Sequence, residues 1–201
     1  MKFPAQVAGN PAGDLAPTVS AAVQTVRVFF ALWPGDLARA DLAHATRQAV
    51  RGCGGRPVPA HNLHATLVFI GSIAVTRLPV LVALASGIAR SKGVAPFELD
   101  FERVEYWPKP RVLVAMANAS VGVAAATALA RALLEATQRE NFAPDSKPFR
   151  PHITIARKVG KLTPVLEMQR TRLAFDSFAL AESRTLPEGP VYSVIESFAL
   201  E

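Results

Sequence analysis

Two short stretches of the sequence each place a histidine and a threonine two residues apart inside an apolar run. The first is NLHATLVFIG, with His64 and Thr66, and the second is FRPHITIARK, with His152 and Thr154. Side chains two residues apart in a β-strand point to the same face. Each stretch therefore predicts a strand with one apolar face and one face that carries a His and a Thr about 6–7 Å apart. Arg150 is expected on the same face as His152.

If the two polar faces meet, these side chains form a cleft suited to phosphoryl chemistry without a metal ion. An imidazole has an ordinary pKa of about 6.5, so near pH 7 one ring can accept a proton while the other donates one. Threonine hydroxyls can donate hydrogen bonds to phosphoryl oxygens, and the guanidinium of Arg150 can neutralise developing charge. One such motif is more often structural, but two copies in one chain favour a functional pair.

A zinc site is the alternative for the same histidines. His61 lies three residues before His64, so His61, His64 and His152 together could bind zinc. A His-x-x-His pair in a strand does not place both rings on one face, and no carboxylate stands beside it. We therefore expect no metal.

Three more side chains near the motifs have two interpretations each. Arg157 alternates away from His152, and it either packs across the sheet or reaches the rim of the cleft. Phe149 and Trp107 either stack on a terminal base or belong to the core.

The composition favours a globular protein with an anionic partner. The chain has 201 residues, 50% of them hydrophobic, which is enough to bury a real core. Its 22 Lys and Arg against 16 Asp and Glu give a formal charge of +6, which favours nucleic acid or a phosphorylated metabolite. The single cysteine, Cys53, excludes an internal disulfide. Because neither a membrane span nor a signal peptide is apparent, we expect no membrane contact and a cytoplasmic protein.

Apolar periodicity predicts the elements that must position the motifs. Strands are expected over residues 26–34, 62–71, 97–106, 111–117, the second motif, 172–180 and 191–200, and helices over residues 35–50, 76–93 and 120–140. This order indicates an α+β protein of two similar halves, each carrying one motif. Residues 1–25 are expected to form a flexible tail, and residues 26–201 a single bilobal domain.

The stretches RVFFALWP, NLHATLVFIG, WPKPRVLVA and FRPHITIAR together resemble the two-histidine phosphoesterase superfamily. Within it they are most similar to the RNA 2′,3′-cyclic phosphodiesterases, also called 2′-5′ RNA ligases. The resemblance covers about residues 26–200. It implies a bilobal α+β fold with two antiparallel β-sheets lining a central cleft, helices on the outside, pseudo-two-fold duplication and no cofactor.

The resemblance also implies roles for the motif residues. His64 would donate a proton to the leaving 3′ oxygen, His152 would accept one from water, and Thr66 and Thr154 would hold the phosphate oxygens. The expected enzyme is a monomer that opens 2′,3′-cyclic phosphates on RNA ends or cyclic nucleotides to 2′-phosphates. Two alternatives remain open. One is RNA 2′-5′ ligation in the same site, with a 5′-hydroxyl in place of water, and the other is a non-catalytic module that binds RNA ends.

Overall fold

The computed structural model describes residues 24–91, 94–160, 166–187 and 189–201. Of the tail predicted over residues 1–25, residues 1–23 lie outside the described residues. The described elements follow one another in the order β1 (Thr25–Leu32), α1 (Asp36–Ala45), α2 (Arg47–Gly52), β2 (Arg56–Pro57), η1 (Ala60–Asn62), β3 (Ala65–Ala74), η2 (Val75–Arg77), α3 (Leu78–Ala89), β4 (Phe97–Trp107), β5 (Val112–Ala117), α4 (Val121–Arg139), β6 (His152–Arg157), β7 (Leu166–Phe175), β8 (Ser177–Leu186) and β9 (Gly189–Ala199). None of the described helices is both long and apolar enough to cross a membrane.

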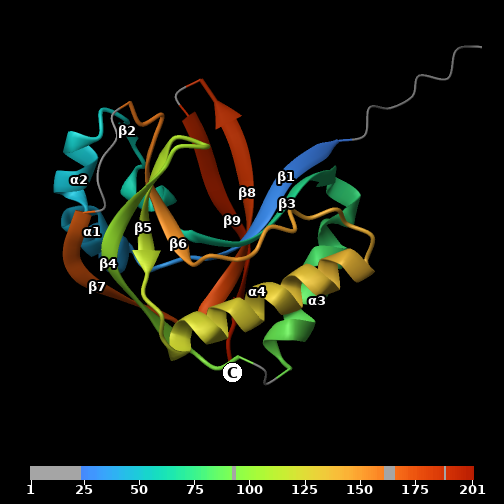
Figure 1. The fold of residues 1–201 in the computed structure, drawn as a ribbon. Helices are drawn as coiled ribbons and strands as arrows, with labels where there is room; N and C mark the ends of the chain where they lie inside the picture. Colours follow the sequence, from blue (N-terminus) through green and yellow to red (C-terminus); the bar gives the residue numbers. More distant parts are fainter. Residues whose placement is uncertain (1–23, 92–93, 161–165, 188) are drawn as a thin grey trace, which may run out of the picture.

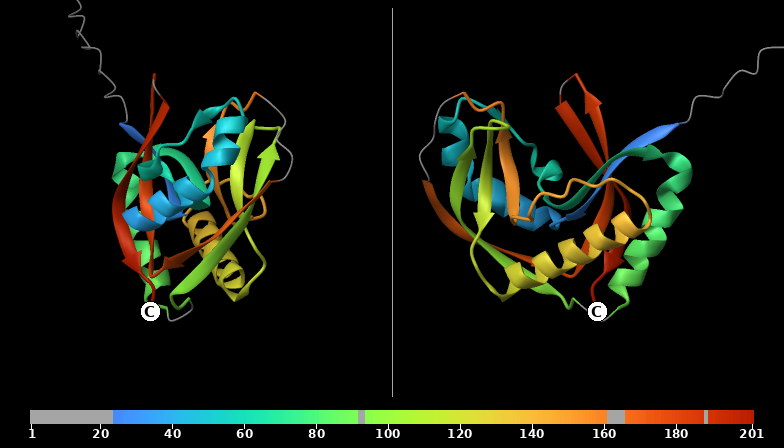
Figure 2. Two further views of the ribbon diagram at one scale, coloured as in Figure 1. Left: turned by 90° about the vertical axis from the view of Figure 1, so that its left-hand side faces the viewer. Right: turned by 45° about the vertical axis from the view of Figure 1, so that its right-hand side comes forward.

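The strands form two antiparallel sheets, as the resemblance implied. The first sheet has the order β3-β1-β8-β9, and the second has the order β2-β6-β5-β4-β7. Figures 1 and 2 show the two sheets as the arms of an open V, with the helices on the outside. Helix α1 packs against β7, and α4 contacts both β3 and β4, so that α4 joins the two sheets. The predicted α+β class with two antiparallel sheets is confirmed.

Each sheet carries one motif strand, but the two sheets are not built from consecutive halves of the chain. β8 and β9, from the end of the chain, complete the sheet that contains β1 and β3, while β2 from the first half pairs with β6. The reason lies in β1, whose last five residues are all buried. A strand buried on both faces belongs in the middle of a sheet, and β8 supplies the second neighbour that β1 needs.

Two predicted elements have different boundaries in the structure. The helix expected over residues 35–50 divides at Thr46, whose hydroxyl donates a hydrogen bond to the Leu42 carbonyl at 2.8 Å. The strand expected over residues 172–180 is the end of β7 and the start of β8, separated by a bend at Asp176. Apolar residues on both sides of that bend explain why the two strands read as one.

Helix α4 lies close to β4 because its second residue is a glycine, Gly122. A Cβ atom on Gly122 would stand 1.8 Å from the backbone oxygen of Glu98. Ser120 caps the same helix end, accepting a hydrogen bond from the Val123 N–H at 3.3 Å. These two residues fix the contact through which α4 supports the second sheet.

The hydrophobic side chains divide into one large core and two small clusters. The large core lies between the sheets and the helices and includes the fully buried Phe30, Phe101 and Phe178. The small clusters lie one on each sheet, the first formed by Phe29, Ala31 and Ala181 with Trp33, Phe69 and Tyr192, and the second by Val112, Val114 and Met116 with Trp107. These small clusters surround the two histidine motifs.

Candidate active site

The two motifs lie on strands of different sheets that contact each other. β3 is the edge strand of the first sheet, and it touches β6 of the second. His64 stands one residue before β3, and His152 is the first residue of β6. The charge of His152 lowers the pKa of His64, so the two imidazoles are close enough to interact electrostatically.

Both imidazoles are held in the same way, by the carbonyl two residues earlier. Nδ1 of His64 is 2.7 Å from the Asn62 oxygen, and Nδ1 of His152 is 2.6 Å from the Arg150 oxygen. A carbonyl only accepts hydrogen bonds, so each Nδ1 carries a proton and donates it. In a neutral ring this leaves Nε2 with a free lone pair. No other described residue bonds either Nε2, so both atoms are available to a substrate.

Aromatic rings fix the plane of each imidazole. Trp33 stacks on His64 with ring centroids 5.1 Å apart and 5° between the planes. Tyr192 meets the same imidazole edge-on, with centroids 4.9 Å apart. Trp107 packs on His152 with centroids 4.4 Å apart. Each imidazole is therefore held by one backbone hydrogen bond and by contact with an indole.

A one-residue bulge interrupts β3 just after its threonine. Thr66 pairs with Ala31 of β1 and Val68 pairs with the adjacent Phe30, so Leu67 is the extra residue. The bulge reverses the alternation of side chains beyond it. Val68, which strict alternation places on the face of Thr66, is buried in the large core instead.

The same device occurs in β6, and there it changes the chemistry of the site. The register of β6 against β5 shifts between Thr154 and Ala156, with Ile155 as the extra residue. Ala156 turns into the large core, and Arg157 returns to the face of His152 and Thr154. The structure thereby decides between the two interpretations of Arg157, because its guanidinium reaches the cleft.

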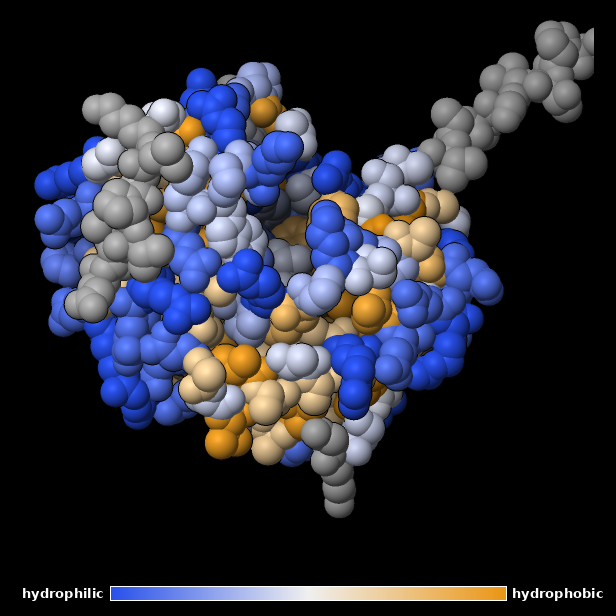
Figure 3. Space-filling model, in the orientation of Figure 1, coloured by the Kyte–Doolittle hydropathy of each residue, from blue (hydrophilic) through white to orange (hydrophobic). Residues whose placement is uncertain are grey.

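A cavity of about 400 Å³ contains the first motif and Arg157. His64, Thr66, Arg27 and Tyr192 line it from the first sheet, and Arg157 enters from the second sheet. Nη2 of Arg157 donates a hydrogen bond to the Tyr192 hydroxyl at 3.0 Å, so this side chain bridges the two sheets. Figure 3 shows the surface hollowed between the sheets, with hydrophilic residues around the opening. Neither His152 nor Thr154 lines this cavity, although both lie on the same face of β6 as Arg157.

Burial keeps both imidazoles neutral in the free protein. The pKa of His64 is lowered to about 4, first by burial and then by the charges of Arg157 and His152, while the hydrogen bond to the Asn62 carbonyl opposes the shift. Burial also lowers the pKa of His152, against the hydrogen bond to the Arg150 carbonyl. The sequence-based expectation of one protonated ring near pH 7 is therefore wrong for the free protein. An anion placed between the rings would raise both pKa values.

Arg150 has partners that the sequence did not indicate. Its side chain is exposed, its Nη2 is 3.3 Å from Glu105 Oε2, and its guanidinium lies 4.9 Å from the centre of the Trp107 ring. The same Glu105 oxygen accepts a hydrogen bond from the Trp107 indole at 3.3 Å. Arg150 and Glu105 together hold the indole that packs on His152, while Arg157, and not Arg150, reaches the cavity from the second sheet.

The structure also places Phe149, Trp107 and the third histidine of the zinc alternative. Phe149 packs against the large core, whereas Trp107 belongs to the support of His152. Among the residues that the structure describes, no group of three or more His, Cys, Asp or Glu side chains is arranged to hold a metal ion. His61, the third histidine of the zinc alternative, is exposed and lines a different cavity from that of His64.

Sequence reasoning missed two aromatic residues of the site. Trp33 belongs to RVFFALWP, a stretch that carried the resemblance, so its position was a usable signal. Tyr192 had no local signal, because only the pairing of β9 with β8 and of β8 with β1 brings it to His64.

The geometry agrees with what comparison of the whole sequence finds. The sequence profile of the 2′-5′ RNA ligase superfamily matches residues 34–182. This chain belongs to that superfamily. An RNA 2′,3′-cyclic phosphodiesterase of Thermus thermophilus is 35% identical over 183 residues, which cover 87% of this chain and 90% of that protein. An RNA 2′,3′-cyclic phosphodiesterase of Escherichia coli is 30% identical over 141 residues, which cover 69% of this chain and 76% of that protein.

Solved structures of the superfamily share the fold. The crystal structure of Escherichia coli LigT complexed with 3′-AMP has a TM-score of 0.77 and 26% identity, and it covers 88% of this chain and 99% of that one. The LigT structure complexed with phosphate has a TM-score of 0.73 at the same identity, with 88% and 98% covered. The resemblance inferred from the two histidine motifs is confirmed.

Proposed function

We propose that this chain is a phosphodiesterase that hydrolyses terminal RNA 2′,3′-cyclic phosphates to 2′-phosphates. Its relatives in Thermus thermophilus and Escherichia coli are named for this activity, and LigT holds 3′-AMP in one crystal structure. The observation that carries the proposal is the pair of imidazoles, each with Nδ1 bonded to the backbone and Nε2 free for a substrate. Two proton-transfer groups on neighbouring strands are what a cyclic ester needs on its two sides.

The reaction assigns one proton transfer to each ring. Water attacks phosphorus while Nε2 of His152 accepts its proton, and the bond between phosphorus and the 3′ oxygen breaks as Nε2 of His64 gives that oxygen a proton. His64 ends neutral and His152 ends protonated, so His152 must release a proton to solvent and His64 must take one up before the next turnover. No step in this sequence requires a metal ion.

The charge of the substrate prepares His64 for its role as the acid. The pKa of this imidazole is about 4 in the free protein because the ring is buried near Arg157. A bound phosphodiester anion would add an opposite charge at the ring and so raise that pKa. The protonated ring would then form together with the complex, and free enzyme would keep a neutral site.

The remaining groups hold the phosphate. Thr66 lies in the cavity beside His64, and its hydroxyl would donate to a phosphoryl oxygen, as would that of Thr154 on β6. Arg157 would supply the positive charge that we first expected from Arg150. The hydrogen bond from Arg157 to the Tyr192 hydroxyl fixes the direction of the guanidinium.

Phosphorus NMR tests the proposal directly. Cytidine 2′,3′-cyclic phosphate incubated with the protein should lose its cyclic-ester signal and give the signal of the 2′-phosphate alone. His64→Ala and His152→Ala should each lower the rate by about 10²–10⁴. The matched control is His44→Ala, because His44 is an exposed helix residue and should leave the rate unchanged. Turnover by the doubly substituted His64→Ala, His152→Ala protein at the wild-type rate would refute the assignment.

Three further parts of the proposal come from the sequence. We propose a single bilobal domain over residues 26–201, a monomer in solution, and a cytoplasmic enzyme that meets RNA ends there. Light scattering of the purified protein and cell fractionation test the last two. Ligation stays a second candidate because the matching profile is that of a 2′-5′ RNA ligase superfamily. A joined product from a cyclic-phosphate RNA and a 5′-hydroxyl RNA would establish it.

A further inference from the structure

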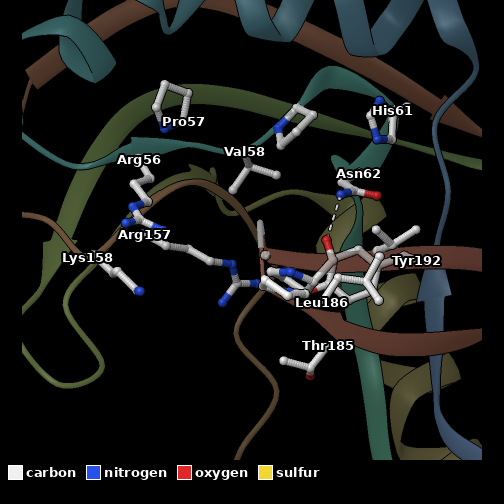
Figure 4. Close-up of a pocket in the computed structure, with 15 residues that line it drawn as sticks. Arg56, Pro57, Val58, His61, Asn62, Arg157, Lys158, Thr185, Leu186 and Tyr192 are labelled. Atoms are coloured by element: carbon white, nitrogen blue, oxygen red, sulfur yellow. Dashed lines mark hydrogen bonds between the residues drawn. The ribbon is translucent and has the colours of Figure 1, made fainter.

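A second cavity, of about 380 Å³, adjoins the one that holds His64. The two cavities share Arg157, Tyr192, Thr185 and Pro190, so these four residues form the boundary between them. Figure 4 shows this second cavity with its walls formed by β2 and η1 on one side and by the β8–β9 hairpin on the other. A volume of this size is in the range of small-ligand sites.

The walls of the second cavity are joined before any ligand arrives. The side-chain amide of Asn62 in η1 donates a hydrogen bond to the Pro190 carbonyl in β9 at 3.1 Å, drawn as a dashed line in Figure 4. Apolar side chains line the interior, among them Pro57, Val58 and Leu186. Leu186 is 46% exposed, which leaves apolar surface uncovered at the mouth. The cavity therefore offers a preformed apolar surface.

Three positive charges enter this cavity, and the sheet geometry places two of them directly opposite each other. Arg56 of β2 and Arg157 of β6 are register partners in an antiparallel pair, and Lys158 follows Arg157. Figure 4 shows the three side chains on the same side of the cavity. Like charges at opposed positions destabilise a strand pair. Within the described part of the chain, no carboxylate forms a salt bridge with any of the three.

An anionic ligand explains this arrangement better than a solvated surface does. A cluster of positive charges that folding tolerates without a counter-charge is stabilised when phosphates bind beside it, one at Arg157 and the next at Arg56 and Lys158. The apolar surface beside the charges suits a ribose and the flat face of a base. Because the two cavities share a wall at Arg157, an RNA whose cyclic end lies at His64 would place its next nucleotide in the second cavity.

We infer that this second cavity binds the RNA chain on the 5′ side of the cyclic end, with Arg56 and Lys158 holding its 5′ phosphate. The inference rests on the proposed function and narrows its substrate class. The preferred substrates are oligonucleotides, or nucleotides with a 5′-phosphate, rather than nucleoside 2′,3′-cyclic phosphates with a free 5′-hydroxyl.

Three substrates and three variants test this inference. The substrates are cytidine 2′,3′-cyclic phosphate, the same compound with a 5′-phosphate, and the dinucleotide CpC with a 2′,3′-cyclic phosphate. The variants are Arg56→Gln, Lys158→Gln and, as the charge-matched control, Arg90→Gln. Arg90 is exposed at the end of α3 and lines neither cavity.

For the wild-type protein, kcat/KM should be about tenfold or more higher for the two substrates with a 5′ phosphate, since a charge-assisted hydrogen bond has about that effect. Arg56→Gln and Lys158→Gln should remove most of this preference. They should leave kcat/KM unchanged for the substrate with a 5′-hydroxyl, which lacks the phosphate that they would hold. Each should also lower the slope of log kcat/KM against log salt by about one for the dinucleotide. Arg90→Gln should change neither quantity.

The inference is overturned if the wild-type protein shows no preference for a 5′ phosphate, a result that needs no folded variant. It is also overturned if Arg56→Gln and Lys158→Gln lower kcat/KM equally for all three substrates, or if Arg90→Gln lowers the preference for a 5′ phosphate as much as they do. Failure of the proposed function looks different. In that case the wild-type protein would convert none of the three cyclic phosphates.

Discussion

The buried imidazole of His64 should make the stability of this protein fall in mild acid, and His64→Gln should remove that part of the fall. The pKa of His64 is about 4 in the folded protein, against about 6.5 for an unperturbed histidine. Between these two values the unfolded chain binds a proton that the folded protein does not bind. The free energy of unfolding therefore rises with pH across this window. The contribution that His64 makes to it is fully present above pH 6.5 and is lost as the pH falls to 4.

Linkage gives the magnitude. With these two pKa values, protonation of the unfolded chain reduces the free energy of unfolding by about 2 kcal/mol at pH 5 and by about 3 kcal/mol at pH 4, relative to pH 7. His64 is only half-buried by its accessible surface, so water in the cleft makes these figures upper limits. Glutamine carries no titratable proton, and His64→Gln should show a correspondingly smaller loss between pH 7 and pH 5.

Urea unfolding of both proteins at pH 7, 6 and 5 measures this difference. His64→Gln also loses contacts with Trp33 and Tyr192, which changes its free energy of unfolding by the same amount at every pH. The comparison therefore uses the change in the free energy of unfolding with pH and not its value at one pH. Inorganic phosphate should raise the pKa of His64 and shrink the difference between the proteins. Parallel curves for the two proteins from pH 7 to pH 5 would refute the reasoning, because they would mean that His64 titrates as a solvated histidine.

Four shorter predictions follow from the same structure. The profile of kcat/KM against pH should be bell-shaped with both limbs below pH 6.5, because burial lowers the pKa of both catalytic histidines in the free enzyme, and a maximum above pH 7 would contradict this. Arg157→Lys keeps the charge but loses the planar fork that also bonds Tyr192, so kcat/KM should fall by about 10–100-fold, and an unchanged value would remove Arg157 from the phosphate site. Gly122→Ala should destabilise the fold by about 2 kcal/mol or more in urea, because its Cβ would stand 1.8 Å from a backbone oxygen, whereas Gly87→Ala in α3, with nothing within 4 Å, should stabilise it by about 0.5–1 kcal/mol. Treatment with EDTA should leave the rate unchanged, and a loss that zinc restores would revive the metal alternative.

The sequence predicted the parts of this site that depend on local spacing. His64 and Thr66 are two residues apart, as are His152 and Thr154, and that spacing alone places each pair on one face of an extended chain. The apolar residues between them predicted strands buried on the other face. Most element boundaries followed in the same way, because apolar periodicity over eight or more residues is a local property.

The parts that failed depend on contacts between distant segments. Tyr192 reaches His64 only because β8 pairs with β1, and nothing within residues 189–199 indicates that pairing. The protonation state of the site failed for a similar reason. Spacing gives the two imidazoles but not their burial, and burial is the largest cause of the lowered pKa of both rings.

The choice between Arg150 and Arg157 shows why alternation is an incomplete guide to a site on a strand. Strict alternation placed Arg150 with His152 and left Arg157 on the opposite face. The extra residue Ile155 reverses the second half of β6, so the arginine five residues after the histidine shares its face. β3 has its own extra residue, Leu67, at the corresponding position after His64. A bulge three residues after the histidine in both motif strands is a feature of the site, since in both strands it ends the His-Thr face and lets the next residue approach from a new angle.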